Sequence, residues 1–278
     1  MDHQTQIERA QALRQMHHGS EVLLLPNAWD AISARLFAKR GFRAIATTSG
    51  GVAWALGYGD GEQVPLAEVL ALVRRIVRAV DLPVTVDFET GYGPTATDVA
   101  NSIRAVIETG AAGVNLEDSE PGHGPMRGVK EAAARIQAAR DAATATGVPL
   151  VINARVDNWL HHATDPASSL EDATHRARAY VAAGADCIYP IGLRDFKTTE
   201  TFVKAVHAPV NVMGGPGTAP LSELARIGVA RVSTATWFAA LALGAIDRAA
   251  GRILQTGHFD ALATDFNYLD AQRLSTDN

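Results

Sequence analysis

Short apolar runs alternate with longer amphipathic stretches along most of this chain. The runs are rich in β-branched residues and end at Gly, Pro or polar residues, which is typical of buried strands. Between most of them, apolar residues recur at helical spacing and a closing glycine often suits the end of a helix. We therefore expect strands within residues 21–26, 43–49, 82–89, 112–117, 149–155, 185–191, 208–213 and 230–235.

This repetition of strand and helix predicts the α/β class, and a single (β/α)₈ barrel of the TIM type fits it best. No linker or low-complexity stretch divides the 278 residues, so we expect one domain over 1–278 with a helical extension from about residue 237. Because periodicity does not prove closure, a doubly wound open sheet is the alternative. The apolar stretch 237–259 could pack on its own barrel or on a neighbouring copy.

Composition narrows the class of protein. The chain is 47% hydrophobic and 20% charged with a net charge of -5, which argues against a basic nucleic-acid surface. It has no run of apolar residues long enough for a membrane span. The single cysteine, Cys187, excludes an intramolecular disulfide and a multi-cysteine metal site. A cytoplasmic protein is the expected setting.

Acidic side chains gather just past two of the predicted strands. Asp87 and Glu89 follow the third run, where we expect them on one face of the strand, and Glu117 and Asp118 follow the fourth. Neighbouring carboxylates repel, and burial pushes their protons back on, unless a cation such as Mg²⁺ joins them. Helix capping is the ordinary alternative for an Asp at such a turn, and Asp118 fits it equally well.

Other polar residues follow the predicted strands. Ser49, Gly50 and Gly51 could offer backbone N–H groups to a substrate anion, or form a flexible turn. Asp60, in the same Gly-rich loop, could reach the metal shell or stabilise the turn. The histidine pairs at 17–18 and 161–162 are expected in solvent.

Arg155 ends an otherwise apolar run. A guanidinium there suits bidentate recognition of a carboxylate or phosphonate, and a structural pair with Asp157 or Glu117 is the alternative. Asn211 has a similar position after the seventh run and could donate to the same anion.

Several segments together resemble the isocitrate lyase/phosphoenolpyruvate mutase superfamily. VDFETGYG followed by VNLEDS is the specific part, and PNAWDAISARLFAKRGFRAIATTSGG, INARVD and NVMGGPG extend the likeness over about residues 22–240. The resemblance implies a (β/α)₈ barrel, with its last helix usually swapped between subunits of a dimer or tetramer. It also implies Mg²⁺, with Mn²⁺ as a substitute, and a small 2-oxo acid substrate whose cleavage gives a metal-stabilised enolate.

The resemblance also implies a role for each matching residue. Asp87 matches the direct Mg²⁺ ligand, and Asp60, Glu89 and Glu117 match an acidic shell reached largely through water. Ser49, Gly50 and Gly51 match the turn that holds the keto-acid end of the substrate. Arg155 matches the arginine that balances substrate charge, and Asn211 matches an asparagine that contacts substrate.

The loop after the fourth run, residues 120–131, departs from the lyases of that family. It lacks the cysteine of their Lys-Lys/Arg-Cys-Gly-His motif, which argues against a true isocitrate or methylisocitrate lyase. His123 and Arg127 are the loop side chains that could act as an acid or an anion clamp, unless His123 is simply solvated. We name His123, Arg155 and Glu117 as catalytic candidates, and we expect the loop to close over the site.

These observations predict an Mg²⁺-dependent lyase that cleaves a C–C bond next to a 2-oxo or 2-hydroxy acid. Oxaloacetate decarboxylase-like or 2-methylisocitrate lyase-like chemistry would fit. A phosphonopyruvate or phosphoenolpyruvate P–C bond mutase or hydrolase is the alternative within the family. A non-catalytic keto-acid-binding protein is the alternative of another class.

Overall fold

The computed structural model of the chain describes residues 2–161 and 169–276. The strands are β1 (Leu23–Leu25), β2 (Asn27–Ala28), β3 (Ile45–Thr47), β4 (Val84–Asp87), β5 (Gly113–Glu117), β6 (Val151–Val156), β7 (Cys187–Pro190), β8 (Asn211–Met213) and β9 (Arg231–Ser233). The longer helices between them are α2 (Ala31–Lys39), α3 (Ser49–Leu56), α4 (Leu66–Ala79), α5 (Ala96–Ile107), α6 (Val129–Thr146), α8 (Ser169–Ala182) and α9 (Phe196–Val206). Shorter helices are α7 (Asn158–His161) and α10 (Leu221–Arg226).

The strands close into a barrel. β2 to β7 pair in parallel in chain order, and β1, β9 and β8 form a second parallel group. Pro26 alone separates β1 from β2, so these two act as one bent strand that joins the groups on one side. A parallel bridge between Ile188 and Val210 joins β7 to β8 on the other. The predicted barrel is therefore confirmed, each predicted run overlaps a strand, and the open-sheet alternative is wrong.

The hydrophobic core lies mainly between the strands and the surrounding helices. On α5, for example, Val99, Ile103 and Val106 are fully buried, which follows from their helical spacing. Inside the barrel, by contrast, many buried positions are polar, among them Asn115, Asn153 and Arg231. The interior of the barrel is thus a polar layer rather than an apolar filling.

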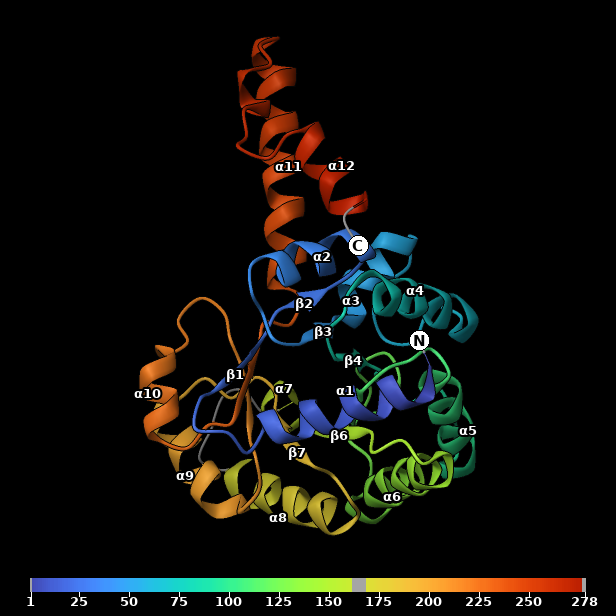
Figure 1. Cartoon of the computed structure of the whole chain (residues 1–278). Helices are drawn as coiled ribbons and strands as arrows, with labels where there is room; N and C mark the ends of the chain where they lie inside the picture. Colours follow the sequence, from blue (N-terminus) through green and yellow to red (C-terminus); the bar gives the residue numbers. More distant parts are fainter. Residues whose placement is uncertain (1, 162–168, 277–278) are drawn as a thin grey trace.

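The N-terminal helix α1 (His3–Met16) lies across the end of the barrel where the strands begin (Figure 1). Gln6 Nε2 donates to the carbonyls of Ile107 and Ala111, just ahead of β5, at 2.8 and 2.9 Å. Arg14 forms a 3.0 Å ion pair with Asp186, just ahead of β7. Helix α1 therefore closes the end of the barrel where the strands begin.

The expectation that the first histidine pair lies in solvent is wrong for His17. This residue follows α1, is buried, and its Nδ1 lies 2.8 Å from the carbonyl oxygen of Leu13. Burial and the nearby Arg231 lower the pKa of His17 to about 3, so the ring is neutral and Nδ1–H donates to that carbonyl. His18 and His161 are exposed as expected, and His162 lies outside the described residues.

A helical extension leaves the barrel at the C-terminal end of the chain. α11 (Trp237–Thr256) projects away from the rest of the molecule, and α12 (Tyr268–Thr276) returns beside it towards α2 (Figure 1). Leu241, Ile246 and Leu254 on α11 are 61%, 65% and 89% exposed. Most of α11 therefore does not pack on its own barrel.

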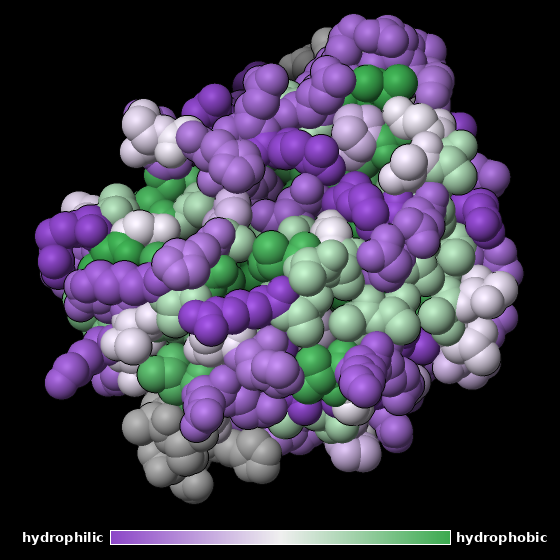
Figure 2. All heavy atoms as spheres, turned by 90° about the horizontal axis from the view of Figure 1, so that it is seen from below, coloured by the Kyte–Doolittle hydropathy of each residue, from purple (hydrophilic) through white to green (hydrophobic). Residues whose placement is uncertain are grey.

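The face of the molecule seen from below is mostly covered by hydrophilic side chains, with hydrophobic ones showing between them (Figure 2). Among the described residues, we find no helix with both the length and the apolar character needed to cross a membrane.

Candidate active site

Asp87 stands at the carboxyl end of β4, where barrel enzymes place their chemistry. Its Oδ2 accepts a 3.1 Å hydrogen bond from the backbone N–H of Ser49, and its own N–H donates to Thr47 Oγ1 at 2.9 Å. Asn115 Nδ2, on the neighbouring strand, lies 3.5 Å from Oδ1. Backbone and side chains of adjacent strands therefore fix the direction of this carboxylate.

Ser49, Gly50 and Gly51 form the first turn of α3 rather than a flexible turn. The Ser49 N–H that we expected to meet a substrate anion contacts Asp87 in this structure. A Cβ atom on Gly50 would lie 3.2 Å from Oδ2 of Asp60, and one on Gly51 would lie 2.9 Å from Cβ of Trp29. Glycine thus lets this turn pack directly beside Asp60.

Glu89 does not lie on the strand with Asp87 as predicted. β4 ends at Asp87, and Glu89 follows in a turn with a φ of 48°, closed by a 2.9 Å bond from Gly91 N–H to the Phe88 carbonyl. Tyr92 Oη donates to Glu89 Oε1 at 2.8 Å. Burial, together with Asp87 and Asp60, raises the pKa of Glu89 to about 7. The turn still brings the carboxylate into the acidic group.

Glu62 is a site residue that the sequence did not reveal. Its Oε1 accepts hydrogen bonds from Thr90 N–H at 2.8 Å, Thr90 Oγ1 at 2.6 Å and Tyr92 N–H at 3.0 Å. Its own N–H donates to Glu89 Oε2 at 2.5 Å. These bonds fasten the Gly-rich loop after α3 to the turn after β4, and so place Asp60 beside the other carboxylates.

Arg155 forms both of the structural pairs that were the alternative to anion binding. Its Nε and Nη2 donate to Oδ1 and Oδ2 of Asp157 at 2.6 and 2.9 Å, and Nη2 also pairs with Glu117 Oε2. All three side chains are buried. Glu117 and Asp157 thus hold the guanidinium rigidly at the carboxyl ends of β5 and β6.

Glu117 and Asp157 share Arg155, but their pKa values shift in opposite directions. For Glu117, burial outweighs the guanidinium, and Asp157 and Asp87 add repulsion, so its pKa is well above the usual value. For Asp157, burial alone would raise the pKa, but two bonds from Arg155 and one from Ser119 Oγ bring it below the usual value. Glu117 is therefore the member of this group that favours a proton.

Asp118 points into the wall of the barrel. Its Oδ1 accepts from Asp157 N–H at 3.0 Å, and its Oδ2 accepts from Tyr180 Oη at 2.7 Å and Arg176 Nη1 at 3.2 Å. It therefore joins β5 to the start of α7 and to α8, and it does not face the metal candidates.

The loop after β5 leans on the Gly-rich loop. A Cβ atom on Gly61 would lie 2.7 Å from Cα of Gly122, so the two backbones are in close contact. His123, at a φ of 56° and 54% exposed at its side chain, places Nε2 3.7 Å from Asp60 Oδ2. Arg127 turns back to the Ser119 carbonyl and to Glu131, and it is buried. Of the two loop candidates, the structure brings His123 to the acidic group.

Asn211 is fully buried on β8, and Nδ2 donates to Ser233 Oγ at 2.9 Å. Within the described part of the chain, its side-chain hydrogen bonds go to Ser233 and do not join it to the carboxylates around Asp87. Cys187 is also fully buried, and burial raises the pKa of its thiol to about 12, as suits a core residue.

The donor set fits a magnesium ion held largely through water. Within residues 2–161 and 169–276, no three His, Cys, Asp or Glu side chains converge as ready-made ligands of one ion. Mg²⁺ does not need such a cage, because it keeps several waters and uses one or two carboxylates. Oδ1 of Asp60 is buried without a hydrogen-bond partner. That orphaned oxygen is an observation that favours a cation or its water.

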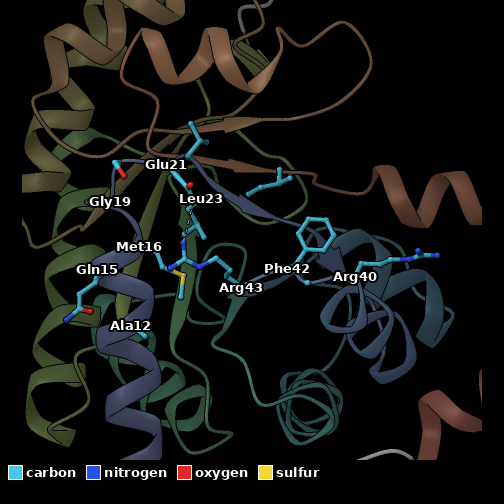
Figure 3. A pocket seen from close by; sticks show the side chains of 13 residues that line it. Ala12, Gln15, Met16, Gly19, Glu21, Leu23, Arg40, Phe42 and Arg43 are labelled. Carbon is cyan, nitrogen blue, oxygen red and sulfur yellow. Dashed lines mark ion pairs between the residues drawn. The ribbon is translucent and has the colours of Figure 1, made fainter.

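A hollow of the described surface lies elsewhere. It measures about 590 Å³ and is bordered by α1, the start of β1 and the segment before β3, where Arg43 pairs with Glu21 at 3.9 Å (Figure 3). Strands begin at that end of the barrel, and barrel enzymes place their catalytic residues at the other end. At the acidic group, the Gly-rich loop and the loop after β5 are in contact at Gly61 and Gly122.

Glu89→Gln is expected to remove a pH-dependent loss of stability from the metal-free protein. Unfolded Glu89 ionises near 4.5 and folded Glu89 near about 7, so the folded state binds more protons between these values. The free energy of unfolding of the wild type therefore falls as pH rises through that window, by about 3 kcal/mol at most. Chemical denaturation in a chelator, from about pH 5 to about pH 8.5, measures the difference.

The control for this experiment is Glu120→Gln, which removes an exposed carboxylate from the neighbouring loop. Its pH dependence should follow that of the wild type. A Glu89→Gln curve parallel to the wild-type curve would show that Glu89 ionises normally in the folded protein.

Comparison with known proteins adds a consistent result. A family model described as phosphoenolpyruvate phosphomutase matches residues 13–254. A probable 2-methylisocitrate lyase 2 of Corynebacterium glutamicum is 31% identical over 260 residues, which cover 90% of this chain and 82% of that lyase.

Solved structures agree with this match. A Burkholderia cenocepacia protein described as a phosphonomutase is 46% identical, with a TM-score of 0.83 over 87% of this chain and 98% of that one. A second protein of that organism, described as a lyase/mutase, is 38% identical, with a TM-score of 0.91 over 98% of this chain and 97% of that one. Phosphonopyruvate hydrolase, in complex with oxalate and Mg²⁺, shares the fold at 22% identity, with a TM-score of 0.82 over 97% and 95% of the two chains.

Proposed function

We propose, from the premise that this chain belongs to the phosphoenolpyruvate phosphomutase family, that it is an Mg²⁺-dependent lyase of small 2-oxo or 2-hydroxy acids. The bond broken would be a C–C bond next to the oxo or hydroxy carbon, leaving an enolate fragment. The relative named as a 2-methylisocitrate lyase supports C–C cleavage, and the oxalate and Mg²⁺ bound by phosphonopyruvate hydrolase support the ligand class.

The observation that carries the proposal is the electrostatic crowding around Asp87. Asp60, Asp87 and Glu89 come from two different βα connections, and each of the first two raises the pKa of Glu89. Asp87 and Glu89 in turn raise the pKa of Glu117. Such an arrangement is unfavourable for folding alone, and a divalent cation relieves it.

Asp87 would hold the ion directly, with Asp60, Glu89 and Glu117 reached through its waters. When bound, Mg²⁺ supplies positive charge that stabilises negative charge developing on the 2-oxo oxygen of the substrate. Mn²⁺ could replace it, because both ions accept oxygen ligands.

The chain's own groups would then bind and protonate the substrate. Arg155, fixed by Asp157 and Glu117, offers a rigid positive charge to the substrate carboxylate, and the first turn of α3 approaches the same space. His123 stands in the loop that lacks the family thiol, and its Nε2 can carry a proton to the carbon left by bond cleavage. The contact between the loops around Gly61 and Gly122 would exclude water.

A panel of substrates tests this function. Oxaloacetate, 2-methylisocitrate and other 2-hydroxy diacids, and phosphonopyruvate are incubated with Mg²⁺ or with a chelator, and pyruvate and phosphate are measured. We expect pyruvate from at least one carbon acid, in Mg²⁺ and not in the chelator. Phosphate from phosphonopyruvate alone would favour the P–C alternative instead. Tight oxalate binding without turnover of any acid would favour a keto-acid-binding protein.

We further propose that the C-terminal extension pairs with a second copy of the chain. α11 leaves leucines exposed over much of its length, and Ala239 is its one buried residue among those described. The lyase/mutase structure from Burkholderia cenocepacia covers 98% of this chain, too much to omit the extension. A dimer or tetramer, measured as solution mass, is the expected result, and a stable monomer would contradict it.

A further inference from the structure

Arg231 is a charged side chain inside the barrel with little hydrogen bonding among the described residues. It lies on β9, is fully buried, and its Nε and Nη1 have no hydrogen-bond partner. Its Nη2 donates to Oδ1 of Asn115 at 3.3 Å. A buried guanidinium that lacks a paired carboxylate is costly, so its presence calls for a reason.

Asn115 connects that guanidinium to Asp87. The same Oδ1 also accepts a 2.8 Å hydrogen bond from Asn153 Nδ2. The Nδ2 of Asn115 lies on the other side, 3.5 Å from Asp87 Oδ1. The register agrees, because Asn115 is the direct partner of Asp87 on β4 and of Asn153 on β6.

The chemistry of the donors decides which way the Asn115 amide points. A guanidinium has no acceptor, so the group that faces Arg231 must be the amide oxygen. The amide nitrogen is then directed at Asp87, where a carboxylate can only accept. A reversed amide would place N–H against N–H at Arg231 and oxygen against oxygen at Asp87.

We propose that Arg231 is a positioning residue for the metal site: through the amide of Asn115 it fixes the direction of the Asp87 carboxylate. The Ser49 N–H holds Oδ2 and the Asn115 amide faces Oδ1, so both oxygens are oriented before an ion arrives. Partners that orient a metal ligand commonly change metal affinity when they are removed. This inference rests on the proposed function, since it assumes that Asp87 binds Mg²⁺.

The sign of the effect on Mg²⁺ binding separates this role from plain electrostatics. Arg231→Met removes a positive charge near a cation site, and Coulomb's law alone predicts tighter Mg²⁺ binding. Loss of the positioning contact predicts weaker binding, by about tenfold or more. Calorimetric titration of the substrate-free protein with Mg²⁺ measures this directly, and thermal unfolding in a chelator verifies that the variant is folded.

A double-mutant cycle tests the route through Asn115. Asn115→Leu should weaken Mg²⁺ binding as much as Arg231→Met, and the double variant should bind no more weakly than Asn115→Leu alone. Arg231→Lys, which keeps a charged group that only donates, should recover part of the affinity. Should Arg231→Met fail to fold, Arg231→Gln replaces it, because a glutamine amide can accept as well as donate and no longer fixes the direction of Asn115.

The matched control is Arg140→Met. Arg140 donates to the Gly184 carbonyl at 3.1 Å and to Asp186, ahead of β7 and away from Asp87. The Arg140→Met substitution should lower thermal stability and leave the Mg²⁺ affinity unchanged. Unchanged or tighter binding in folded Arg231→Met or Arg231→Gln overturns the positioning role while leaving the metal site intact. Absence of Mg²⁺ binding by the wild type overturns the metal site itself, and the positioning role with it.

Discussion

Replacing Asp87 by Asn is expected to lower turnover by a factor on the order of 1,000, because the ion would lose the direct ligand we propose for it and several kcal/mol of charge stabilisation with it. The titration of Mg²⁺ should show a parallel loss of affinity. In a chelator, however, the variant should unfold no earlier than the wild type, because one carboxylate has left a group whose members repel each other. Loss of function without loss of fold is the combination that identifies a metal ligand.

Asp195→Asn is the control for Asp87→Asn. Asp195 precedes α9, is exposed, and caps that helix by accepting from Thr198 N–H at 2.7 Å, a role that asparagine also fills. Its turnover and Mg²⁺ affinity should equal those of the wild type. If Asp87→Asn also bound Mg²⁺ and turned over normally, the ion would have to be held elsewhere.

Replacing Arg155 by Met is expected to lower the free energy of unfolding more than replacing it by Lys or replacing Lys204 by Met. Asp157 would be left buried without its counter-charge, close to Glu117, and breaking such a buried pair costs about 3–5 kcal/mol. Arg155 holds the pKa of Asp157 below its ordinary 3.8, so its contribution is complete at neutral pH and is lost as pH falls through the folded pKa. The difference in the free energy of unfolding between wild type and variant should therefore become smaller in acid. Urea denaturation at several pH values measures it.

Lys204→Met serves for comparison, because Lys204 and Glu200 form an exposed pair at 2.8 Å on α9. Its removal should cost less than about 1 kcal/mol at any pH. Arg155→Lys should fall between the two, since it keeps the charge and loses the bidentate bonds to Asp157. A variant of Arg155 as stable as Lys204→Met would mean that the buried carboxylates are protonated without it.

The strands could be predicted from the sequence because each is a short apolar run with a clear end. The position of Asp87 followed from the same rule, since a polar residue directly after a buried run must lie at the strand's end. Glu89 did not follow, because the chain turns after Asp87 and a positive φ at a non-glycine residue has no sequence signal. His17 was also misplaced, since a histidine after a polar helix looks exposed until that helix packs across the barrel and buries it.

The sequence did not decide which groups Arg155 contacts, for a different reason. A guanidinium at a strand end can serve a ligand or a neighbouring carboxylate, and only the register of β5 with β6, which pairs Glu117 with Arg155, chooses between them. Asn115 and Arg231 could have been found by alternation. Each lies two residues before a polar residue at the end of the same strand, Glu117 or Ser233, so it faces the same side.

The polar lining of the barrel separates the residues of the candidate site from the residues that stabilise the fold. Because the strands turn Asn115, Asn153 and Arg231 inward, the apolar contacts that drive folding are left to the outer sides of the strands and the helices that cover them. Better packing between the strands and the outer helices, for instance around Val99 and Ile103, would raise the thermal stability of the protein without disturbing the polar interior of the barrel. Engineering for durability and engineering for a new substrate could therefore proceed on separate sets of positions.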